Sequence, residues 1–352
     1  MESYQIALIP GDGIGPTVVE KTRPLIDAVA HSHDFAIQYN VHEWGSERYL
    51  ETDAMMPDDS LSQLRPADAI FVGAVGHPDI PDHITLNGLL LPIRKAFDQY
   101  ICKRPSVLYP GVESPLRGYT GRSIDFVVFR ENTEGEYADI GGREHQGFQT
   151  ETAVQSALFT REGVTRIAHA AFEAASARQG HLTNVTKSNA QAYGMVLWDD
   201  VIETVAEDYP DVTVEHLLVD AASMDLIRRP DEFDVIVASN LFGDIITDIG
   251  AQITGSMGLA PSANINPDPE YPSMFEPVHG SAPDIAGEQI ANPLATVLSW
   301  AMLFEEIDET AAAETLREGV SKQLTDTSAP RTPDLGGDAS TERIISDLQA
   351  RI

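Results

Sequence analysis

The stretch Ser239-Asn-Leu-Phe-Gly-Asp-Ile-Ile-Thr-Asp248 sets two carboxylates four residues apart in an otherwise apolar segment. On a helix, that spacing places Asp244 and Asp248 on one face, one turn apart. The two like charges repel each other there, and a divalent cation held between them would relieve the repulsion. Carboxylate oxygens are the ligands that Mg2+ and Mn2+ prefer. We therefore expect a metal site on a helix, against the alternative of a solvated acidic face.

Short apolar segments alternate with helical patterns along the chain, which predicts an α/β architecture. Strands are expected at residues 4–10, 35–44, 69–75, 124–129, 212–219 and 233–238, and another ends near residue 186. Helices are expected up to residue 30 and at residues 89–99, 161–178, 188–209 and 293–307. Two of the strands close on Asp220 and Ser239, and ligands of open α/β sheets bind outside the carboxyl ends of strands.

Five further residues are candidates for chemistry. Arg94, Arg104 and Arg130 lie at or just beyond the ends of predicted elements. An arginine fork matches a carboxylate, so three converging arginines would suit a di-acid; the alternative is that each pairs with a surface acid. Lys187, at a strand-to-helix junction, is a candidate general base, because nearby cations lower the pKa of a lysine. Tyr137 is a candidate proton donor, or an ordinary half-buried tyrosine.

Composition limits the class of protein. The 352 residues are enough for one large or two medium domains, and 42% of them are hydrophobic. The N-terminus has no basic region before an apolar stretch, and no apolar run reaches about 18 residues, so we expect neither a signal peptide nor a membrane span. Cys102 is the only cysteine, which excludes an intramolecular disulfide and fits a reducing cytoplasm.

The formal net charge is −32, which disfavours binding to nucleic acid and to anionic membranes. Asp and Glu are spread along the chain, and only five residues are lysine. Acidic, lysine-poor surfaces resemble those of proteins from organisms with molar salt in the cytoplasm. At that salt concentration the Debye length is about 3 Å, so self-repulsion is screened. We therefore expect a cytoplasmic protein of a halophile.

The loop Gly11-Asp-Gly-Ile-Gly-Pro16 does not fit the Rossmann fingerprint G-x-G-x-x-G, because its glycines recur at every second residue. Six ordered motifs together resemble the β-decarboxylating dehydrogenases, the isocitrate/isopropylmalate dehydrogenase family, over nearly the whole chain. They are Ile9-Pro-Gly-Asp-Gly-Ile-Gly-Pro16, Arg94 with Arg104-Pro105, Arg130-Glu-Asn-Thr-Glu-Gly135, Thr186-Lys-Ser-Asn189, Asn240-Leu-Phe-Gly-Asp244 and Glu276-Pro-Val-His-Gly-Ser-Ala-Pro-Asp284.

The resemblance implies a two-domain α/β fold with a continuous mixed sheet, which is not a Rossmann fold. The large, NAD-binding domain would contain residues 1–99 and 250–352. The small dimerisation domain would contain residues 100–249, with an arm near residues 138–152 and the metal and base residues.

The resemblance also gives each candidate residue a role. Arg94, Arg104 and Arg130 match the positions that bind the malate portion of the substrate. Tyr137 matches the position that protonates the enol, and Lys187 matches the one that takes the hydroxyl proton. The ligands of Mg2+ or Mn2+ are matched by Asp220, Asp244 and Asp248. In this family the lysine and the first aspartate reach the site from the partner subunit. The resemblance therefore implies a homodimer with shared active sites, or a tetramer built from such dimers.

NAD is the cofactor that the resemblance implies, with K+ as an activator. In this family the adenosine ribose lies against the segment after His-Gly-Ser/Thr-Ala-Pro, where a carboxylate binds the 2′-OH and repels a 2′-phosphate. This chain has Asp284-Ile285 there, whereas NADP-dependent members resemble Lys-Tyr. The positions expected to contact NAD are Ile14, Glu276, His279, Gly280, Ser281, Ala282, Asp284, Ile285 and Asn292.

The segment Thr85-Leu-Asn-Gly-Leu-Leu-Leu-Pro-Ile-Arg94 is similar to the tartrate/D-malate branch, because it has one residue more between Gly and Arg than isopropylmalate enzymes. Thr85 and Leu89 are its expected substrate contacts. Asn87 departs from the aromatic residue usual in that branch. Residues 89–91 would instead suit an isopropyl group, so 3-isopropylmalate is the alternative substrate. Isocitrate and homoisocitrate come after it, because no extra polar partners for a third carboxylate are evident.

We therefore expect an NAD- and Mg2+/Mn2+-dependent enzyme that oxidises and decarboxylates a malate-type 2-hydroxy-3-carboxy acid. D-malate or tartrate is the leading substrate, and D-malate would give pyruvate, CO2 and NADH. A non-catalytic member of the family is the alternative from another class. Such a protein would be expected to lack a base, an acid or a metal ligand, and none is missing.

Overall fold

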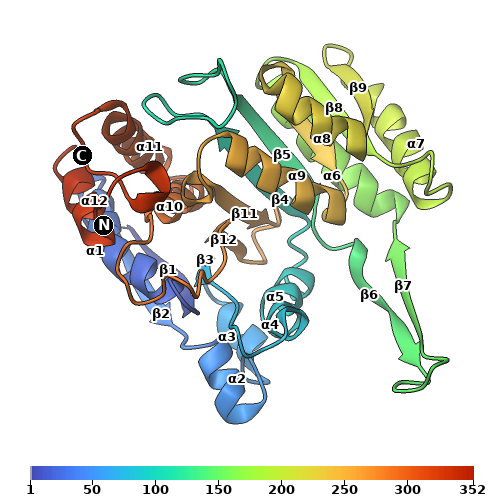
Figure 1. Cartoon of the computed structure of the whole chain (residues 1–352), viewed down its shortest axis with the longest axis horizontal. Coiled ribbons are helices and arrows are strands. Elements are labelled where there is room, and N and C mark those ends of the chain that lie inside the picture. The colour runs from blue at the N-terminus through green and yellow to red at the C-terminus, as the bar shows by residue number, and fades with distance from the viewer. Residues whose placement is uncertain (1) are drawn as a thin grey trace. The chain divides into compact units, whose positions relative to one another are not determined.

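The computed structural model describes residues 2–352 and divides them into two compact units. The first unit contains residues up to 99, 107–123 and 251–352, and the second contains residues 100–106 and 124–250. Ten strands belong to a mixed sheet and two form a separate hairpin (Figure 1). The predicted α/β fold with a mixed sheet is confirmed.

The first unit contributes five neighbouring strands to the mixed sheet. Their sequence across the sheet is β2 (Phe35–Val41), β1 (Glu2–Gly11), β3 (Ala69–Ala74), β12 (Ser273–Pro277) and β11 (Pro261–Ile265). β1 pairs in parallel with β2 and β3, and β12 pairs in parallel with β3, but β11 runs antiparallel to β12. The antiparallel strand separates this order from a Rossmann sheet, whose strands are parallel.

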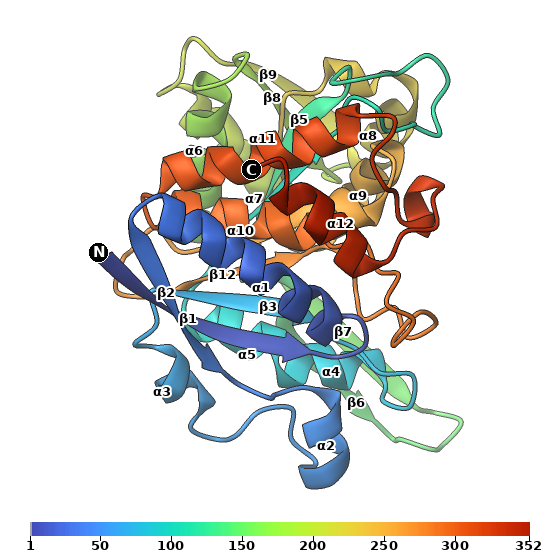
Figure 2. The same ribbon diagram turned by 90° about the vertical axis from the view of Figure 1, so that its left-hand side faces the viewer.

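The central strands are buried on both faces, so β3 is a continuous apolar run, whereas the edge strand β2 is mostly half-buried or exposed. On one face lie α1 (Gly15–Ser32) and α10 (Leu294–Glu306), where Trp300 stacks on Phe71 with ring centroids 4.4 Å apart. Figure 2 shows α11 (Thr310–Thr325) and α12 (Thr341–Gln349) beside them. On the other face, α5 (Leu90–Ala96) packs Ile93 against the sheet. Shorter helices of this unit are α2 (Ser46–Thr52), α3 (Ser60–Leu64), α4 (Asp82–Gly88), η2 (Met257–Leu259) and η3 (Pro333–Leu335).

The second unit has a parallel core that brings several strand ends to one edge. The strand order is β4 (Ile101–Val107), β5 (Asp125–Glu131), β10 (Val235–Ala238), β8 (His181–Thr186) and β9 (Thr213–Leu218). β5, β10, β8 and β9 are mutually parallel. The helices are α6 (Arg161–Ser176), α7 (Gly194–Ala206), α8 (Val219–Arg228), η1 (Pro230–Glu232) and α9 (Asn240–Ile253).

The expected arm is present as an antiparallel hairpin of β6 (Gly135–Glu144) and β7 (Thr152–Leu158), which extends away from the helices of its unit (Figure 1). Its side chains are mostly exposed, including Phe148 at the tip and Val154. The hairpin is longer than the arm expected near residues 138–152, because β6 begins at Gly135 and β7 ends at Leu158.

Two differences from the sequence predictions have local causes. Residues 107–123 were placed in the small domain, but they pack within the first unit, where Ser114 Oγ donates to the carbonyl of Ile253 at 2.6 Å. The helix expected from residue 188 begins at Gly194, because the amides of Ala190 and Gln191 both turn back to the carbonyl of Lys187. The helices α8, α11 and α12 were not predicted.

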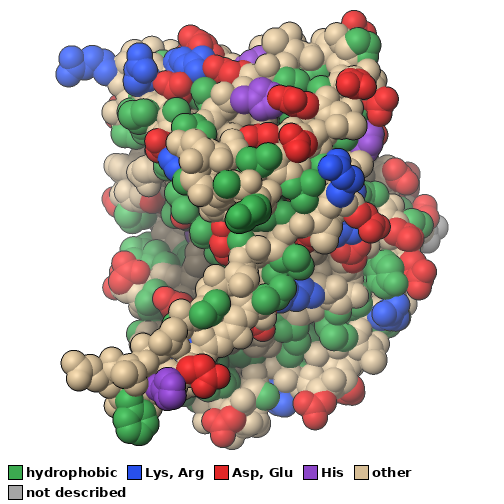
Figure 3. All heavy atoms as spheres, turned by 90° about the vertical axis from the view of Figure 1, so that its right-hand side faces the viewer, with side chains coloured by type: hydrophobic (Ala, Val, Ile, Leu, Met, Phe, Trp, Pro, Cys, Tyr) green, Lys and Arg blue, Asp and Glu red, His purple; other side chains and the backbone are tan. Residues whose placement is uncertain are grey.

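Acidic side chains lie scattered over the face drawn in Figure 3, among uncharged ones, and do not gather in a single area. That distribution follows the even spread of Asp and Glu along the chain. Among residues 2–352, no helix combines the length and the apolar character needed to cross a bilayer.

Candidate active site

Four strand ends of the second unit carry the predicted catalytic and binding residues. Asp220 lies in the first turn of α8, after β9, and Lys187 directly follows β8. α9 follows β10 and carries Asp244, while Arg130 is near the end of β5. Because these four strands are parallel neighbours, their carboxyl ends share one edge. The sequence prediction of a site at strand ends agrees with this arrangement.

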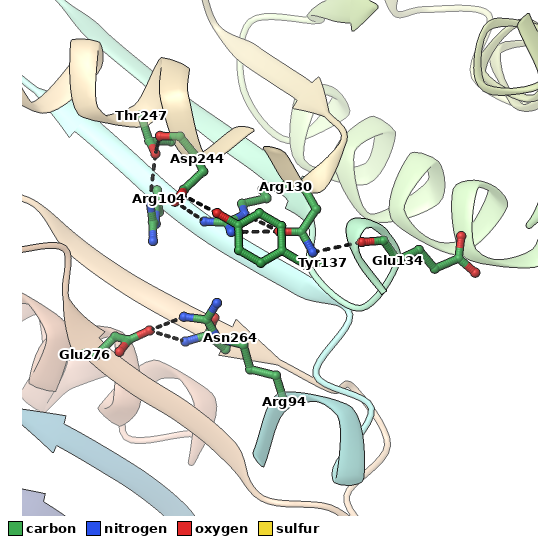
Figure 4. Close-up of polar contacts among 10 residues, drawn as sticks. Arg94, Arg104, Arg130, Glu134, Tyr137, Asp244, Thr247, Asn264 and Glu276 are labelled. Carbon is green, nitrogen blue, oxygen red and sulfur yellow. Dashed lines mark hydrogen bonds and ion pairs between the residues drawn. The ribbon is translucent and has the colours of Figure 1, made fainter. Parts of the chain in front are cut away.

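Asp244 is the centre of the polar cluster in the upper part of Figure 4. Its Oδ1 accepts hydrogen bonds from Arg104 Nη1 at 3.2 Å and from Arg130 Nη1. Its Oδ2 accepts from the hydroxyl of Tyr137 at 3.1 Å. The Arg130 guanidinium also lies over the Tyr137 ring, 5.5 Å from the ring centre. Four residues that the sequence assigned to substrate, acid and metal roles are therefore in direct contact.

The two arginines of this cluster are buried, although each carries a charge. Arg130 is 1% exposed and Arg104 is 7% exposed. Arg104 Nη1 also donates to Thr247 Oγ1 at 2.8 Å. Buried guanidinium groups require anionic or polar partners, and an anionic substrate is a suitable further partner.

Asp244 and Asp248 lie one turn apart on α9, as their spacing predicted. Asp248 is exposed, and its pKa is raised by partial burial and then by the charge of Asp244, against the opposing effect of Arg104 and Arg130. Partial burial is the larger cause, and the repulsion between the two carboxylates adds to it. A divalent cation would relieve that cost, and carboxylate oxygens are a fitting donor set for Mg2+ or Mn2+. These two residues therefore fit the expected metal.

Lys187 and Asp220 form a separate pair in the same unit. Lys187 Nζ donates a hydrogen bond to Asp220 Oδ1, and this contact lowers the pKa of the Asp220 carboxyl. The pair follows from topology, since β8 and β9 are parallel neighbours and each residue follows its strand. The side chains remain reachable, at 26% exposure for Lys187 and 62% for Asp220.

No three Asp, Glu, His or Cys side chains within residues 2–352 of one chain are grouped so that they could hold a metal. The three predicted ligands Asp220, Asp244 and Asp248 are therefore not assembled by a single copy of the chain. Asp244 and Asp248 supply one part, and Asp220 lies in the separate lysine pair.

In the first unit, Arg94 is held by the start of the predicted cofactor loop. Its Nη2 donates to Glu276 Oε1 at 2.7 Å, and Asn264 Nδ2 donates to the same oxygen at 3.0 Å (Figure 4). Arg94 is 4% exposed and Asn264 is fully buried. A buried ion pair that also receives an amide hydrogen bond keeps both charged groups in a defined orientation.

The two remaining substrate contacts are less accessible than expected. Leu89 is 0% exposed and belongs to the core cluster that contains Ile93 and Phe97. Its side chain packs against protein, so the structure does not support its predicted contact with substrate. Thr85 is 3% exposed, and its hydroxyl donates to the carbonyl of Asp82 within α4. Thr85 lies on the inward face of α4, and Leu89 lies at the junction of α4 and α5, where it packs into the core. A motif comparison detects neither orientation.

The predicted cofactor loop meets the glycine loop of the N-terminus. The amide of Ile14 donates to the carbonyl of Ser281 at 2.9 Å. Gly13 has φ +56°, and a Cβ there would lie 2.0 Å from the same oxygen, so only glycine permits this approach. Ile14 packs with Ala282 and Ile285 in one apolar cluster. Ile14 therefore contacts three other predicted cofactor residues, which are Ser281, Ala282 and Ile285.

Four further residues of the cofactor prediction are His279, Gly280, Asp284 and Asn292. Burial lowers the pKa of His279, and its buried Nε2 has no hydrogen-bond partner among the described residues. Such an atom is a fitting contact for a bound cofactor. A side chain at Gly280 would meet nothing within 4 Å, so the loop is open there. Asp284 is exposed and available to a ribose hydroxyl, and Asn292 Nδ2 donates to Asp334.

The sequence assigned no role to Asp12, Asn240, Asn264 or Asp334. Asp12 is 6% exposed and accepts hydrogen bonds from the amide and hydroxyl of Ser46 and from the amide of Gly76. It therefore ties the glycine loop to the start of α2 and to the loop after β3. Its position between two glycines was the available signal, because a buried acid in such a loop usually binds backbone donors.

Replacement of Asp12 by alanine is expected to lower the free energy of unfolding by about 2–4 kcal/mol, since two buried donors and one half-buried donor lose a charged acceptor. Urea unfolding of the two proteins in molar KCl measures the change. Asp58→Ala, at an exposed position, is the matched control and is expected to be neutral. Equal stability of the two variants would contradict the structural role of Asp12.

Comparison with known proteins gives the relationship. The family model for isocitrate/isopropylmalate dehydrogenase matches residues 5–348. A probable tartrate dehydrogenase/decarboxylase from Agrobacterium vitis is 48% identical, over 98% of this chain and 96% of its own length. The D-malate dehydrogenase [decarboxylating] of Escherichia coli is 46% identical, over 99% and 98%. The crystal structure of isocitrate dehydrogenase from Methylococcus capsulatus is 33% identical, with a TM-score of 0.89 and 99% of both chains covered. The chain belongs to the isocitrate/isopropylmalate dehydrogenase family.

Proposed function

We propose that this protein is an NAD-dependent decarboxylating dehydrogenase of D-malate or tartrate that uses Mg2+ or Mn2+. The observation that carries the proposal is the cluster in which Arg104, Arg130 and Tyr137 meet at Asp244. It combines anion-binding groups, a hydroxyl donor and a metal-ligand carboxylate on neighbouring elements. Relatives between 42% and 48% identical carry names with tartrate or D-malate.

Charge balance favours a cation and a di-acid together. Arg104 and Arg130 bring two positive charges, and Asp244 and Asp248 bring two negative ones. A divalent cation and a dicarboxylate add charges that cancel, so the pair enters the cluster without a net change. A mono-acid with the cation would leave excess positive charge next to two buried guanidiniums, which is unfavourable at low dielectric.

In the reaction, the arginines hold the two carboxylates and fix the hydroxyl-bearing carbon. Lys187 takes the proton of the substrate hydroxyl, and Tyr137 later delivers a proton to the carbon that has lost CO2. When bound, NAD would supply the hydride acceptor and the divalent cation would supply a Lewis acid for the new carbonyl. Asp244 and Asp248 would hold the cation, while Ser281, His279 and Asp284 would hold the dinucleotide.

A homodimer with shared sites accounts for the separation of the predicted ligands. Lys187 and Asp220 pair with each other, away from the hydrogen bonds of Asp244. If each site takes this pair from the partner subunit, every predicted ligand and the base meet in one place. The exposed arm, with Phe148 and Val154, offers apolar surface to a second copy.

The branch that acts on D-malate or tartrate is favoured over isopropylmalate. An isopropyl group needs an open apolar pocket, but Leu89 is fully buried in the core, and Leu90 and Leu91 are 8% and 5% exposed. Their side chains are already packed. Asn87 is exposed and polar on α4, where its amide donates to the carbonyl of His83.

We further propose that the protein works in a cytoplasm with molar salt. The charge of −32 and the scarcity of lysine support this, because salt screens the self-repulsion of an acidic surface. Activity and unfolding temperature are then expected to rise with KCl concentration. A protein that is fully active and equally stable in dilute buffer would contradict the proposal.

The testing experiment compares kcat/KM for D-malate, the tartrates, 3-isopropylmalate and isocitrate, with Mn2+, NAD and high KCl. We expect D-malate or a tartrate to be preferred, CO2 to appear with NADH, and NADP to be used at least tenfold less well, because Asp284 repels its 2′-phosphate. Chelation of the metal is expected to abolish turnover, and Mn2+ to restore it. A preference for 3-isopropylmalate would overturn the substrate assignment, and absence of turnover with all four acids would overturn the function.

A further inference from the structure

We propose that Asn240 is a positioning residue, which fixes the plane of the Arg130 guanidinium without cancelling its charge. The inference rests on the proposed function in one respect, that Arg130 binds a substrate carboxylate. It assigns a role to a residue whose side-chain oxygen and nitrogen both bind other groups of the protein. It also explains why an amide, and not an acid, stands at this position.

The contact covers one whole edge of the guanidinium. Arg130 Nε and Nη2 donate to the same oxygen, Oδ1 of Asn240, at 3.0 and 2.7 Å. Two bonds from one edge fix the rotation of the planar group, which a single bond does not. The opposite nitrogen, Nη1, is the one that donates to Asp244. Asn240 is 1% exposed, so water does not compete for its oxygen.

The Asn240 side chain is itself fixed. Its Nδ2 donates to the carbonyl of Glu134 at 3.1 Å, which defines which end of the amide carries the oxygen. The turn at Gly135 has φ +71°, and a Cβ there would lie 3.3 Å from the Asn240 Cβ. The same loop that leads into the arm, and to Tyr137, therefore holds Asn240 in place.

The absence of a side chain at Gly243 on α9 leaves room for the aliphatic part of the Arg130 side chain. A Cβ on Gly243 would lie 2.7 Å from Cβ and 2.8 Å from Cγ of Arg130. Real side chains do not tolerate such distances, so glycine is required for Arg130 to reach its position. Asn240 and Gly243 lie three residues apart on one helix face and hold the two ends of the same side chain.

The neutral amide of Asn240 matters because Asp244, the other partner of Arg130, has a second proposed role. Asp244 is a proposed ligand of the divalent cation, so its charge is not available to Arg130 alone. An aspartate at position 240 would add a carboxylate against the buried guanidinium and form a closed ion pair. Arg130 would then attract a substrate carboxylate less strongly. The amide oxygen supplies the orientation and leaves the positive charge for the ligand.

The test uses Asn240→Asp and Asn240→Ala, with Asn184→Asp as the matched control. Asn184 is also a fully buried amide of the second unit; its Oδ1 accepts from Trp198 Nε1 at 2.7 Å, and its Nδ2 contacts Asp199 Oδ1 at 2.9 Å and His216 Nδ1 at 3.1 Å. Both Asn240 variants are expected to raise the KM for D-malate roughly tenfold to hundredfold, with a smaller change in kcat. Asn184→Asp is expected to leave KM unchanged, whatever it does to the unfolding temperature.

A thermodynamic cycle separates positioning from a general loss of structure. Binding of D-malate with Mn2+, without NAD, is measured by calorimetry for Asn240→Ala, Arg130→Lys and the double variant. Lysine has no guanidinium edge, so the effect of Asn240→Ala is expected to vanish in the Arg130→Lys background. Additive effects, or wild-type KM in folded Asn240 variants, would overturn the inference. If the wild-type enzyme turns over none of the acids, the proposed function fails instead.

Discussion

Replacement of Lys187 by alanine is expected to lower kcat by roughly a hundredfold to ten-thousandfold, which is the usual contribution of a general base. Lys187 is the candidate base, and its amino group is accessible beside Asp220. The KM for D-malate is expected to change little, because the groups predicted to bind the substrate are arginines. Steady-state rates with Mn2+ and NAD in high KCl measure the effect.

Lys322→Ala is the matched control for the loss of a lysine. Lys322 lies on α11 and pairs with Glu318 on the surface. Such exposed pairs contribute little, so wild-type kcat and stability are expected. Near wild-type kcat in the Lys187→Ala enzyme would remove Lys187 from the mechanism. A loss of kcat together with a collapse of the unfolding temperature would point to a structural role.

Subunits with Lys187→Ala and subunits with Tyr137→Phe are expected to be nearly inactive alone and to regain activity after dissociation and reassociation together. In a heterodimer with shared sites, one site combines an intact Tyr137 with the partner subunit's Lys187. Random reassociation makes half of the dimers heterodimers, with one good site of two, so about one quarter of wild-type activity is expected.

The matched control mixes Tyr137→Phe with Asp244→Asn. These residues belong to one hydrogen-bonded cluster of a single chain, so every site of every dimer lacks one of them and no activity returns. Recovery in this control, or none in the first mixture, would contradict the shared site. The second outcome would place Lys187 and Tyr137 in the same chain's site.

Local sequence was sufficient where chemistry depends on spacing or on strand ends. The four-residue interval between Asp244 and Asp248 predicted a helical pair, and α9 contains it. The apolar run 69–75 predicted a buried strand, and β3 is buried throughout. Parallel strands carry their carboxyl ends to one edge, so Lys187 and Asp220 meet although 33 residues separate them.

The sequence did not predict which individual side chains are buried. Leu89 lies in a segment that matches substrate-binding enzymes, but the short helices α4 and α5 turn it into the core. Whether a leucine at this junction faces a pocket or the interior depends on how the two flanking helices are rotated against the sheet. That rotation is set by packing with residues far away in the chain, such as Met274.

The sequence by itself determined the family, the α/β fold class and the residue types of the site, because ordered motifs and periodic spacing are local properties. Only the tertiary structure decided which groups are partners. Arg104 and Arg130 converge on Asp244, Asn240 orients Arg130, and Asp220 pairs with Lys187 and not with the α9 carboxylates. Hydrogen bonds act over about 3 Å, and only the packing of strands and helices brings residues more than a hundred positions apart to that distance.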